Sequence, residues 1–174
     1  AALVIGSGPV RIGQGIEFDY CAVQAARTLR DDGSSAVMVN SNPETVSTDF
    51  DASSRLYFEP LDAESVLEVI DAETRAGEDR LPALIQFGGQ TPLNLAATLE
   101  KAAVPTPGIN VDAIERAEER TRFASMIESL GIPQPRGGIA TSLEEALAVA
   151  DEIGYPVLVR PSFVIGGLAI DFCY

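Results

Sequence analysis

Three short segments of this sequence combine glycines with polar residues in a way that could bind an anion. Backbone N–H groups in a glycine-rich turn, and at the helix N-terminus that often follows it, can point at phosphate or carboxylate groups. A plain strand-to-helix turn would contain the same residue types, so both interpretations stay open for each segment. The residues concerned are Gly8, Gly13 and Gly15 in the first segment, Gly88, Gly89, Gln90 and Thr91 in the second, and Gly166 and Gly167 in the third.

The first segment, residues 6–15, does not match the dinucleotide-binding fingerprint. The pattern Gly-x-Gly-x-x-Gly needs its third glycine where the sequence has Arg11, and the next glycine is Gly13. The acid that would bind a ribose hydroxyl at the end of the second strand is replaced by Asn40. NAD binding is therefore disfavoured, and the segment is either a tight turn or a loop that faces a substrate.

Two arginines are candidates for pairing with an anionic ligand. Arg160 follows the apolar run 157–159, and an arginine that closes a hydrophobic strand loses hydration unless an anion pairs with it. A long side chain that reaches solvent explains the same pattern. Arg120 comes four residues after Arg116, a like-charge spacing that surface ion pairing on a helix does not favour.

The composition excludes several kinds of chemistry. The 174 residues include no His and two Cys, which removes His-based metal sites and Ser-His or Cys-His nucleophile pairs. Twelve Lys and Arg against 26 Asp and Glu give a net charge of −14, the opposite of a general nucleic-acid binder. No apolar run approaches the ~20 residues of a membrane helix. We expect Cys21 and Cys173 to be small buried hydrophobic residues in a cytoplasmic, reducing environment.

The elements that must position these residues alternate between strand and helix along the first two thirds of the sequence. This alternation predicts an α/β fold with a Rossmann-like, mostly parallel sheet. A helix is expected over 17–31, another after the capping residue Asp62, and a third that Thr91 caps with Pro92 at its first position. The polar run 40–54 should lie outside the carboxyl end of a strand, where such sheets bind ligands. Strands are expected at 3–5, 36–39, 56–58 and 84–87, with a fifth edge strand at 104–108.

The pattern changes after about residue 110, and we place a domain boundary near residues 110–118. Beyond it, one charged helix is predicted over 112–130, and Ser142 with Glu145 forms a capping box that opens another helix. Short strands are expected at 137–141 and 156–160. The sequence starts and stops inside expected strands, so we interpret it as a piece of a longer protein.

Four strings in this sequence, taken together and in this order, are similar to the large subunit of carbamoyl-phosphate synthetase. They lie at 13–21, 42–49, 88–92 and 160–163, and the resemblance covers essentially the whole chain. These versions resemble the second half of that subunit, which phosphorylates carbamate. The resemblance implies a pre-ATP-grasp, Rossmann-like domain at 1–115 and the truncated N-terminal part of an ATP-grasp domain at 116–174.

The resemblance also implies an activity. It is that of an ATP-dependent carbon–nitrogen ligase, which makes carbamoyl phosphate for arginine and pyrimidine biosynthesis in the cytoplasm. The implied cofactors are ATP and Mg²⁺ (or Mn²⁺), with metal ligands outside this stretch, so the piece alone is expected to be inactive. The implied partners are the remainder of the large subunit, a glutamine amidotransferase small subunit, and the substrates carbamate or bicarbonate and ammonia. No nucleic acid or membrane is expected.

The same resemblance implies roles for individual residues. Arg120 and Arg160 correspond to contacts with ATP phosphates, and Gly166 and Gly167 to a loop that covers the nucleotide. The loops from Gly8 to Gly15 and from Gly88 to Thr91 are similar to those that face an interior substrate passage. One departure is Leu168, because the family usually has an arginine directly after the paired glycines. The alternative is a non-catalytic nucleotide- or substrate-binding module on the same scaffold.

Overall fold

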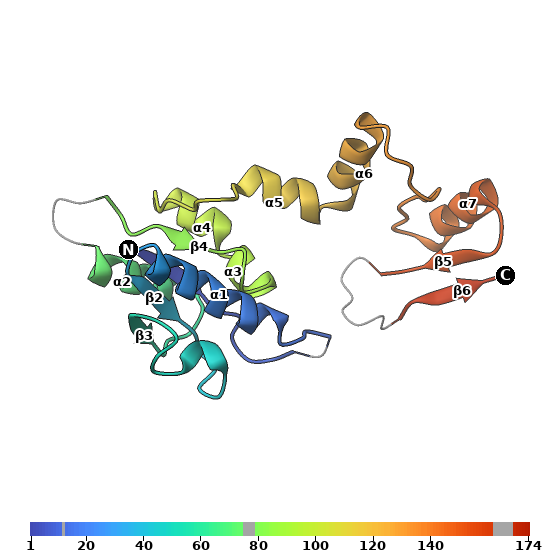
Figure 1. The fold of residues 1–174 in the computed structure, drawn as a ribbon. Helices are drawn as coiled ribbons and strands as arrows, with labels where there is room; N and C mark the ends of the chain where they lie inside the picture. Colours follow the sequence, from blue (N-terminus) through green and yellow to red (C-terminus); the bar gives the residue numbers. More distant parts are fainter. Residues whose placement is uncertain (12, 75–78, 162–168) are drawn as a thin grey trace. The chain divides into compact units, whose positions relative to one another are not determined.

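The computed structural model describes residues 1–11, 13–74, 79–161 and 169–174 (Figure 1). These residues divide into two compact units. The first unit is Ala1–Arg11 with Gly15–Glu119, and the second is formed mainly by Arg120–Tyr174. None of the described helices is long and apolar enough to cross a membrane.

The first unit is built on a parallel sheet of four strands in the order β3-β2-β1-β4. The predicted α/β fold with a mostly parallel sheet is therefore confirmed. The fifth strand predicted at 104–108 is wrong, because Pro105 and Pro107 have no N–H to continue a ladder. The Pro105 carbonyl accepts a single backbone hydrogen bond, from Ala83 N–H at 2.9 Å. The strands are β1 (Ala2–Ile5), β2 (Ala36–Val39), β3 (Arg55–Tyr57) and β4 (Ala83–Leu84).

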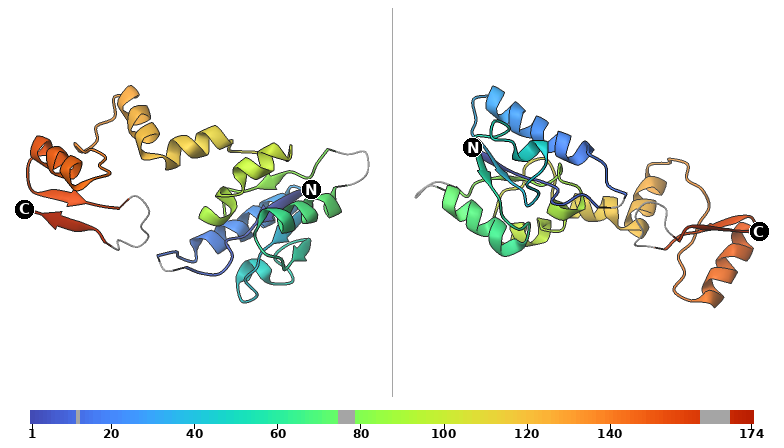
Figure 2. Two further views of the ribbon diagram at one scale, coloured as in Figure 1. Left: turned by 180° about the vertical axis from the view of Figure 1, so that it is seen from behind. Right: turned by 90° about the horizontal axis from the view of Figure 1, so that it is seen from below.

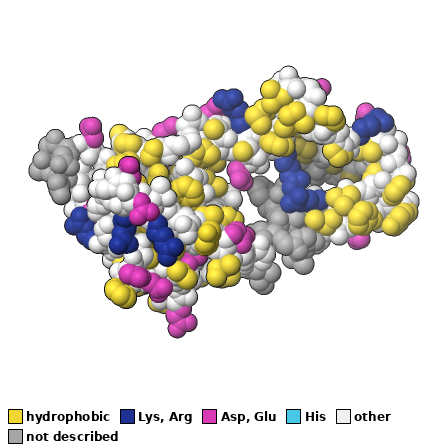
Figure 3. All heavy atoms as spheres, in the orientation of Figure 1, with side chains coloured by type: hydrophobic (Ala, Val, Ile, Leu, Met, Phe, Trp, Pro, Cys, Tyr) yellow, Lys and Arg dark blue, Asp and Glu magenta, His cyan; other side chains and the backbone are white. Residues whose placement is uncertain are grey.

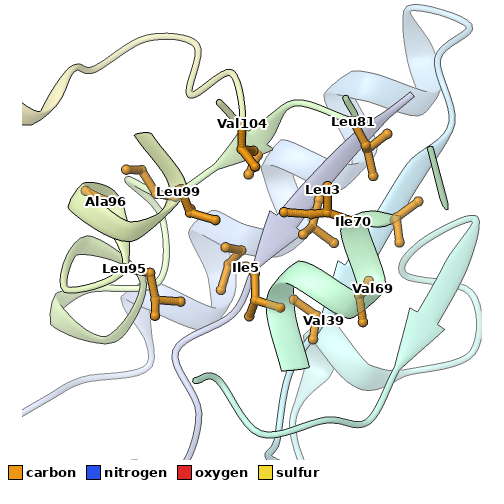
Figure 4. Packing of buried hydrophobic residues seen from close by; sticks show 14 of the residues in the cluster. Leu3, Ile5, Val39, Val69, Ile70, Leu81, Leu95, Ala96, Leu99 and Val104 are labelled. Carbon is orange, nitrogen blue, oxygen red and sulfur yellow. The ribbon is translucent and has the colours of Figure 1, made fainter. Parts of the chain in front are cut away.

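Both faces of this sheet are buried, and successive residues of the central strands alternate between them. On one face, Leu3 and Ile5 of β1 pack with α2 (Ala63–Glu73) and α4 (Ala96–Lys101) (Figure 4). On the other face, Val4 and Met38 pack with Ala22 and Ala26 of α1 (Glu17–Asp31). The right-hand view of Figure 2 shows α1 and α2 on opposite sides of the sheet. Burying one aliphatic side chain contributes about 1.5–3 kcal/mol, so these two layers hold the strands in place.

The helix ends of the first unit follow the expected signals with one exception. Asp62 caps α2, since its Oδ1 accepts a hydrogen bond from Ser65 N–H at 2.8 Å. The bounds of α1 are those predicted, and Gly33 follows it with a φ of 80°. The predicted cap at Thr91 is wrong: α3 (Gln90–Leu93) has Gly89 at its N-cap, and the Thr91 hydroxyl donates to the Ser7 carbonyl at 3.2 Å instead.

The region after residue 110 contains two helices where one was predicted. The helix α5 (Val111–Glu118) ends because Glu119 is extended, with φ −82° and ψ 118°, and α6 (Arg120–Ser129) starts afterwards. The Ser142 capping box of α7 (Leu143–Ile153) is confirmed: Ser142 Oγ accepts from Glu145 N–H, and the Glu145 carboxylate accepts from Thr141 N–H at 2.7 Å. The strand predicted at 137–141 is absent. The antiparallel pair β5 (Val157–Val159) and β6 (Asp171–Cys173) completes the described part.

The second unit buries far less apolar surface than the first. Within its described residues only Ala150 is a buried hydrophobic residue, and α6 buries none. Hydrophobic side chains gather on the visible surface over α6 and over β5 and β6 (Figure 3), and Leu158 and Phe172 are 53% and 61% exposed. The prediction that both cysteines are buried is wrong, because Cys21 is half-buried and Cys173 is exposed.

A polar latch joins β3 to the last turn of α2. Tyr57 Oη donates to Glu73 Oε1 at 2.6 Å, and Arg55 Nη2 lies 3.0 Å from Glu73 Oε2. The Glu73 side chain is only 5% exposed, so these two partners replace contacts with water that burial removes. The hydrogen bond to Glu73 raises the pKa of Tyr57 above its ordinary value of 10.0, with burial and the Glu73 charge adding to the effect and Arg55 opposing it.

We expect Tyr57→Phe to lower the free energy of unfolding by about 1.5 kcal/mol at pH 7, as for a hydrogen bond to a charged group. Because the folded-state pKa of Tyr57 is raised, this contribution is fully present below pH 10.0 and is lost as the pH rises through the folded-state pKa. Urea unfolding followed by circular dichroism at neutral and alkaline pH measures both effects. Tyr174→Phe is the control, because Tyr174 is 91% exposed. Equal stability losses in the two variants at pH 7 would show that the Tyr57–Glu73 hydrogen bond does not stabilise the fold.

Candidate functional site

The carboxyl ends of the parallel strands β1, β2 and β4 meet at one edge of the sheet, where three loops start. Open α/β sheets bind ligands outside this edge. Side chains and glycines from the three loops and from the start of α1 contact one another here, and we call this set the carboxyl-end cluster. Its members are Gly8, Asp19, Asn40, Ser47, Gly88, Gly89 and Thr91.

Asn40 joins the loop after β1 to the loop after β2. Its side chain is fully buried, and its Oδ1 accepts hydrogen bonds from Gly8 N–H at 3.0 Å and Asn42 N–H at 3.3 Å. Its Nδ2 donates to Ser47 Oγ at 3.0 Å. A side chain on Gly6 would clash with this amide, since a Cβ there would lie 2.6 Å from Asn40 Cγ. The sequence interpretation used Asn40 as evidence against NAD and placed it in a loop at the ligand-binding edge, but it missed this bridging role. A polar residue directly after a fully apolar strand was the available signal.

Asp19 links the loop after β2 to α1. Its Oδ2 accepts a hydrogen bond from Ser47 N–H at 3.1 Å, and Ser47 belongs to the short helix η1 (Val46–Thr48). Asp19 is 5% exposed, and its Oδ1 is buried with no hydrogen-bond partner among the described residues. The sequence offers a general reason for acids in a first helical turn, the helix dipole, and this reason does not separate the buried Asp19 from the exposed Glu17.

The second glycine segment packs tightly against the first. A Cβ on Gly88 would lie 2.5 Å from the Gly6 carbonyl oxygen and 2.7 Å from that of Ile5, so no side chain fits there. Gly89 has φ 67° and ψ −148°, a backbone conformation that glycine adopts readily. The Thr91 hydroxyl completes the contact by donating to the Ser7 carbonyl.

The structure brings only some of the predicted loop residues together. Gly8, Gly88, Gly89 and Thr91 belong to the carboxyl-end cluster. Gln90 is exposed, and its Nε2 donates to Glu118 Oε2 at 3.1 Å instead. Gly13 and Gly15 are exposed, and the Cβ position of Gly15 lies beside the Glu17 carboxylate. The role of these residues toward a substrate stays a prediction.

The residues predicted to bind ATP lie in the second unit or outside the described residues. Arg120 is the first residue of α6 and Arg160 directly follows β5. Both are exposed, and neither guanidinium group has a hydrogen bond or ion pair to another described residue. Because β5 is itself largely exposed, desolvation gives no argument for an anion at Arg160, and its ATP role stays a prediction. Gly166, Gly167 and Leu168 fall outside the described residues.

A site for Mg²⁺ is not formed by the residues that the structure places. No group of three or more His, Cys, Asp or Glu side chains gathers there in a way that could hold a metal ion. The exposed arginines suit a phosphate, whose oxygens accept hydrogen bonds from a guanidinium group. The two arginines are therefore suited to binding the phosphates of a nucleotide, whereas the described residues do not form a site for its metal ion.

Two family models match consecutive parts of the chain. The model of the carbamoyl phosphate synthase preATP-grasp domain matches residues 1–116, and the model of the carbamoyl-phosphate synthase L chain, ATP binding domain, matches residues 119–174. The chain belongs to the carbamoyl phosphate synthase large-chain family. The resemblance identified in the sequence is thereby confirmed, and the boundary at 115/116 stays a prediction at that precision.

Curated relatives agree with this assignment. The carbamoyl phosphate synthase large chain of Thermomicrobium roseum is 60% identical over 174 residues, and that of Myxococcus xanthus is 59% identical over 172 residues. The large chain of Archaeoglobus fulgidus is 54% identical over 172 residues. Each match covers 99% of this chain and only 15–16% of the relative, so the chain spans about a sixth of the length of these proteins.

Solved structures support the fold. The biotin carboxylase domain of Hydrogenobacter thermophilus 2-oxoglutarate carboxylase, in complex with MgADP, ADP and bicarbonate, has a TM-score of 0.68 at 25% identity, covering 98% of this chain and 37% of that one. N5-carboxyaminoimidazole ribonucleotide synthetase from Thermus thermophilus has a TM-score of 0.65 at 19% identity, covering 91% of this chain and 38% of that one. The second likeness concerns the fold alone.

The packing at Gly88 generates a stability prediction. We expect Gly88→Ala to cost about 1–3 kcal/mol, the usual cost of overpacking, because the new methyl group meets backbone carbonyls that cannot rotate away. Gly137→Ala is the matched control, since nothing lies within 4 Å of a Cβ at that position. Urea unfolding of both variants measures the difference. A Gly88→Ala variant as stable as the Gly137→Ala variant would show that the loops at this edge are not closely packed.

Proposed function

We propose that this chain is part of a large chain that uses ATP to phosphorylate carbamate, giving carbamoyl phosphate and ADP. The observation that carries the proposal is the consecutive match of a preATP-grasp model and an ATP-binding model of carbamoyl phosphate synthase. We further propose that the parent protein is cytoplasmic and serves arginine and pyrimidine biosynthesis. A glutamine amidotransferase small subunit would supply its ammonia.

The chemistry requires no nucleophile from the protein. A carbamate oxygen attacks the γ-phosphorus of ATP, a new O–P bond forms, and the bond from that phosphorus to the β,γ-bridging oxygen breaks, so that ADP leaves with the electron pair. A chain without His is compatible with this in-line transfer, since positioning and charge stabilisation do most of the work. Bound Mg²⁺ would neutralise phosphate charge, with ligands outside the described residues.

Within this chain, we assign the phosphate contacts to Arg120 and Arg160. Both are exposed and have no partner among the residues that the structure describes, so their guanidinium groups are available to phosphate oxygens. The MgADP and bicarbonate in the biotin carboxylase structure support nucleotide and Mg²⁺ use on a related scaffold. The leucine at position 168 favours the alternative, a binding module without catalysis, because it replaces an expected cation.

We test the phosphate role at Arg160, which directly follows β5. In the full-length large chain, we expect Arg160→Ala to cost about 2–4 kcal/mol of transition-state stabilisation, as for loss of a charge-stabilising donor. The measurement is kcat/KM for ATP formation from carbamoyl phosphate and ADP. Arg27→Ala, at an exposed site on α1, is the control. Near-normal kcat/KM in Arg160→Ala would contradict the phosphate role.

The 174-residue chain by itself should make no carbamoyl phosphate, because it spans only about 16% of its relatives and its described residues hold no metal site. The measurement is ADP release from ATP with and without carbamate, using the purified chain. The full-length large chain under the same conditions is the positive control. Carbamate-dependent ADP release from the short chain would overturn this expectation.

A further inference from the structure

The last residue of α5 carries a charge that the helix dipole disfavours. Glu118 ends this helix and Glu119 follows it, whereas cations are the residues that stabilise a helix C-terminus. Helix stability therefore gives no reason for a carboxylate at position 118. Its oxygen Oε2 accepts a hydrogen bond from Gln90 Nε2 at 3.1 Å. Residues that break a local rule in this way are found preferentially at functional sites.

The donor of this bond is held firmly by its neighbours in the chain. Gln90 is the first residue of α3 and directly follows Gly88 and Gly89. A Cβ on Gly88 would lie 2.5 Å from the Gly6 carbonyl oxygen, so the backbone there is closely packed. On the other side of Gln90, the Thr91 hydroxyl donates to the Ser7 carbonyl at 3.2 Å. The Gln90 side chain therefore reaches α5 from a fixed position.

The acceptor lies where the chain passes from one unit to the next. Residues 1–116 match the preATP-grasp model, residues 119–174 match the ATP-binding model, and the division between the compact units falls after Glu119. Ile114 is buried in the core of the first unit, whereas residues 115–118 are exposed. Core packing therefore holds the middle of α5, and the bond from Gln90 to Glu118 restrains its end.

We propose that Gln90 is a positioning residue for the nucleotide. It acts through Glu118 on Arg120, whose guanidinium group we assign to an ATP phosphate, and does not contact the nucleotide itself. This inference rests on the proposed function and deepens it by adding a residue of the preATP-grasp part to the handling of ATP.

The short stretch of chain between Glu118 and Arg120 transmits the restraint. Arg120 is two residues further on, and two extended residues span at most about 7 Å, so holding Glu118 also limits where Arg120 can lie. A guanidinium group whose backbone is already restrained loses less freedom when it pairs with phosphate. The carboxylate suits this task, because a hydrogen bond with an ionised acceptor is roughly twice as strong as a neutral one.

The test measures MgADP binding to the full-length large chain by titration calorimetry. We expect Gln90→Ala to raise the dissociation constant about fivefold, the factor that corresponds to one lost hydrogen bond. In an Arg120→Ala background, the same substitution should change the constant by less than about twofold, since no guanidinium group remains to be positioned. Glu100→Ala is the control and should leave the constant unchanged, because it removes an exposed carboxylate near the end of α4.

Glu118→Ala provides a second variant that removes the acceptor instead of the donor. We expect the same rise in the dissociation constant, and the same loss of effect in the Arg120→Ala background. Assays of ATP formation then separate the two reactants. The KM for ADP should rise about fivefold in Gln90→Ala, while the KM for carbamoyl phosphate stays within about twofold.

Three results would overturn the inference. The first is an unchanged dissociation constant for MgADP in Gln90→Ala, and the second is a rise that persists in the Arg120→Ala background. The third is a rise confined to the KM for carbamoyl phosphate, which would assign Gln90 to the other reactant. Unaltered MgADP binding in Arg120→Ala would overturn it together with the phosphate role of that arginine. Absence of ATP formation by the unmodified large chain would instead refute the proposed function.

Discussion

The buried amide of Asn40 is the interaction on which the edge of this sheet depends. Because all four strands are parallel, their carboxyl ends place several loops side by side, and the polar groups there need partners inside a region largely closed to water. One asparagine side chain can both donate and accept, and Asn40 uses these capacities to join Gly8, Asn42 and Ser47. An acid at this position could not donate to Ser47, so the residue that argues against NAD also holds the loops together.

Residues of the first unit were predictable wherever a local pattern decides the outcome. The bounds of β2 and α1 follow from an unbroken apolar run and a clear amphipathic period, and both match the structure. Asp62 was found because a cap is a short-range signal, and the same holds for Ser142 in the second unit. The glycines at 8, 88 and 89 were found for the same reason, since tight turns restrict residue type locally.

The remaining features depend on contacts between distant residues. The break at Glu119 has no glycine or proline to signal it, so the charged stretch looked like one helix. Thr91 has the chemistry of a cap, but its hydroxyl donates a hydrogen bond to the carbonyl of Ser7, which is 84 residues away. Asp19 and Asn40 are buried only because the sheet brings the loops after β1 and β2 together, and a sequence pattern does not encode that meeting. Local signals therefore located the loops of the site, and the tertiary fold selected the side chains that hold them.

The distribution of charge bears on the proposal that this chain contributes to binding a phosphate. A chain with a net charge of −14 repels phosphate unless local cations offset the field. Arg55, Arg80 and Arg116 pair with Glu73, Asp71 and Asp112, so their charge is already used within the first unit. Arg120 and Arg160 have no such partner among the described residues, and their exposure means that they remain hydrated at little cost. Pairing with phosphate at these two positions would then cost the loss of hydration but would break no ion pair. The free-energy cost would be smaller than for Arg55, Arg80 or Arg116, each of which would first have to leave its carboxylate partner.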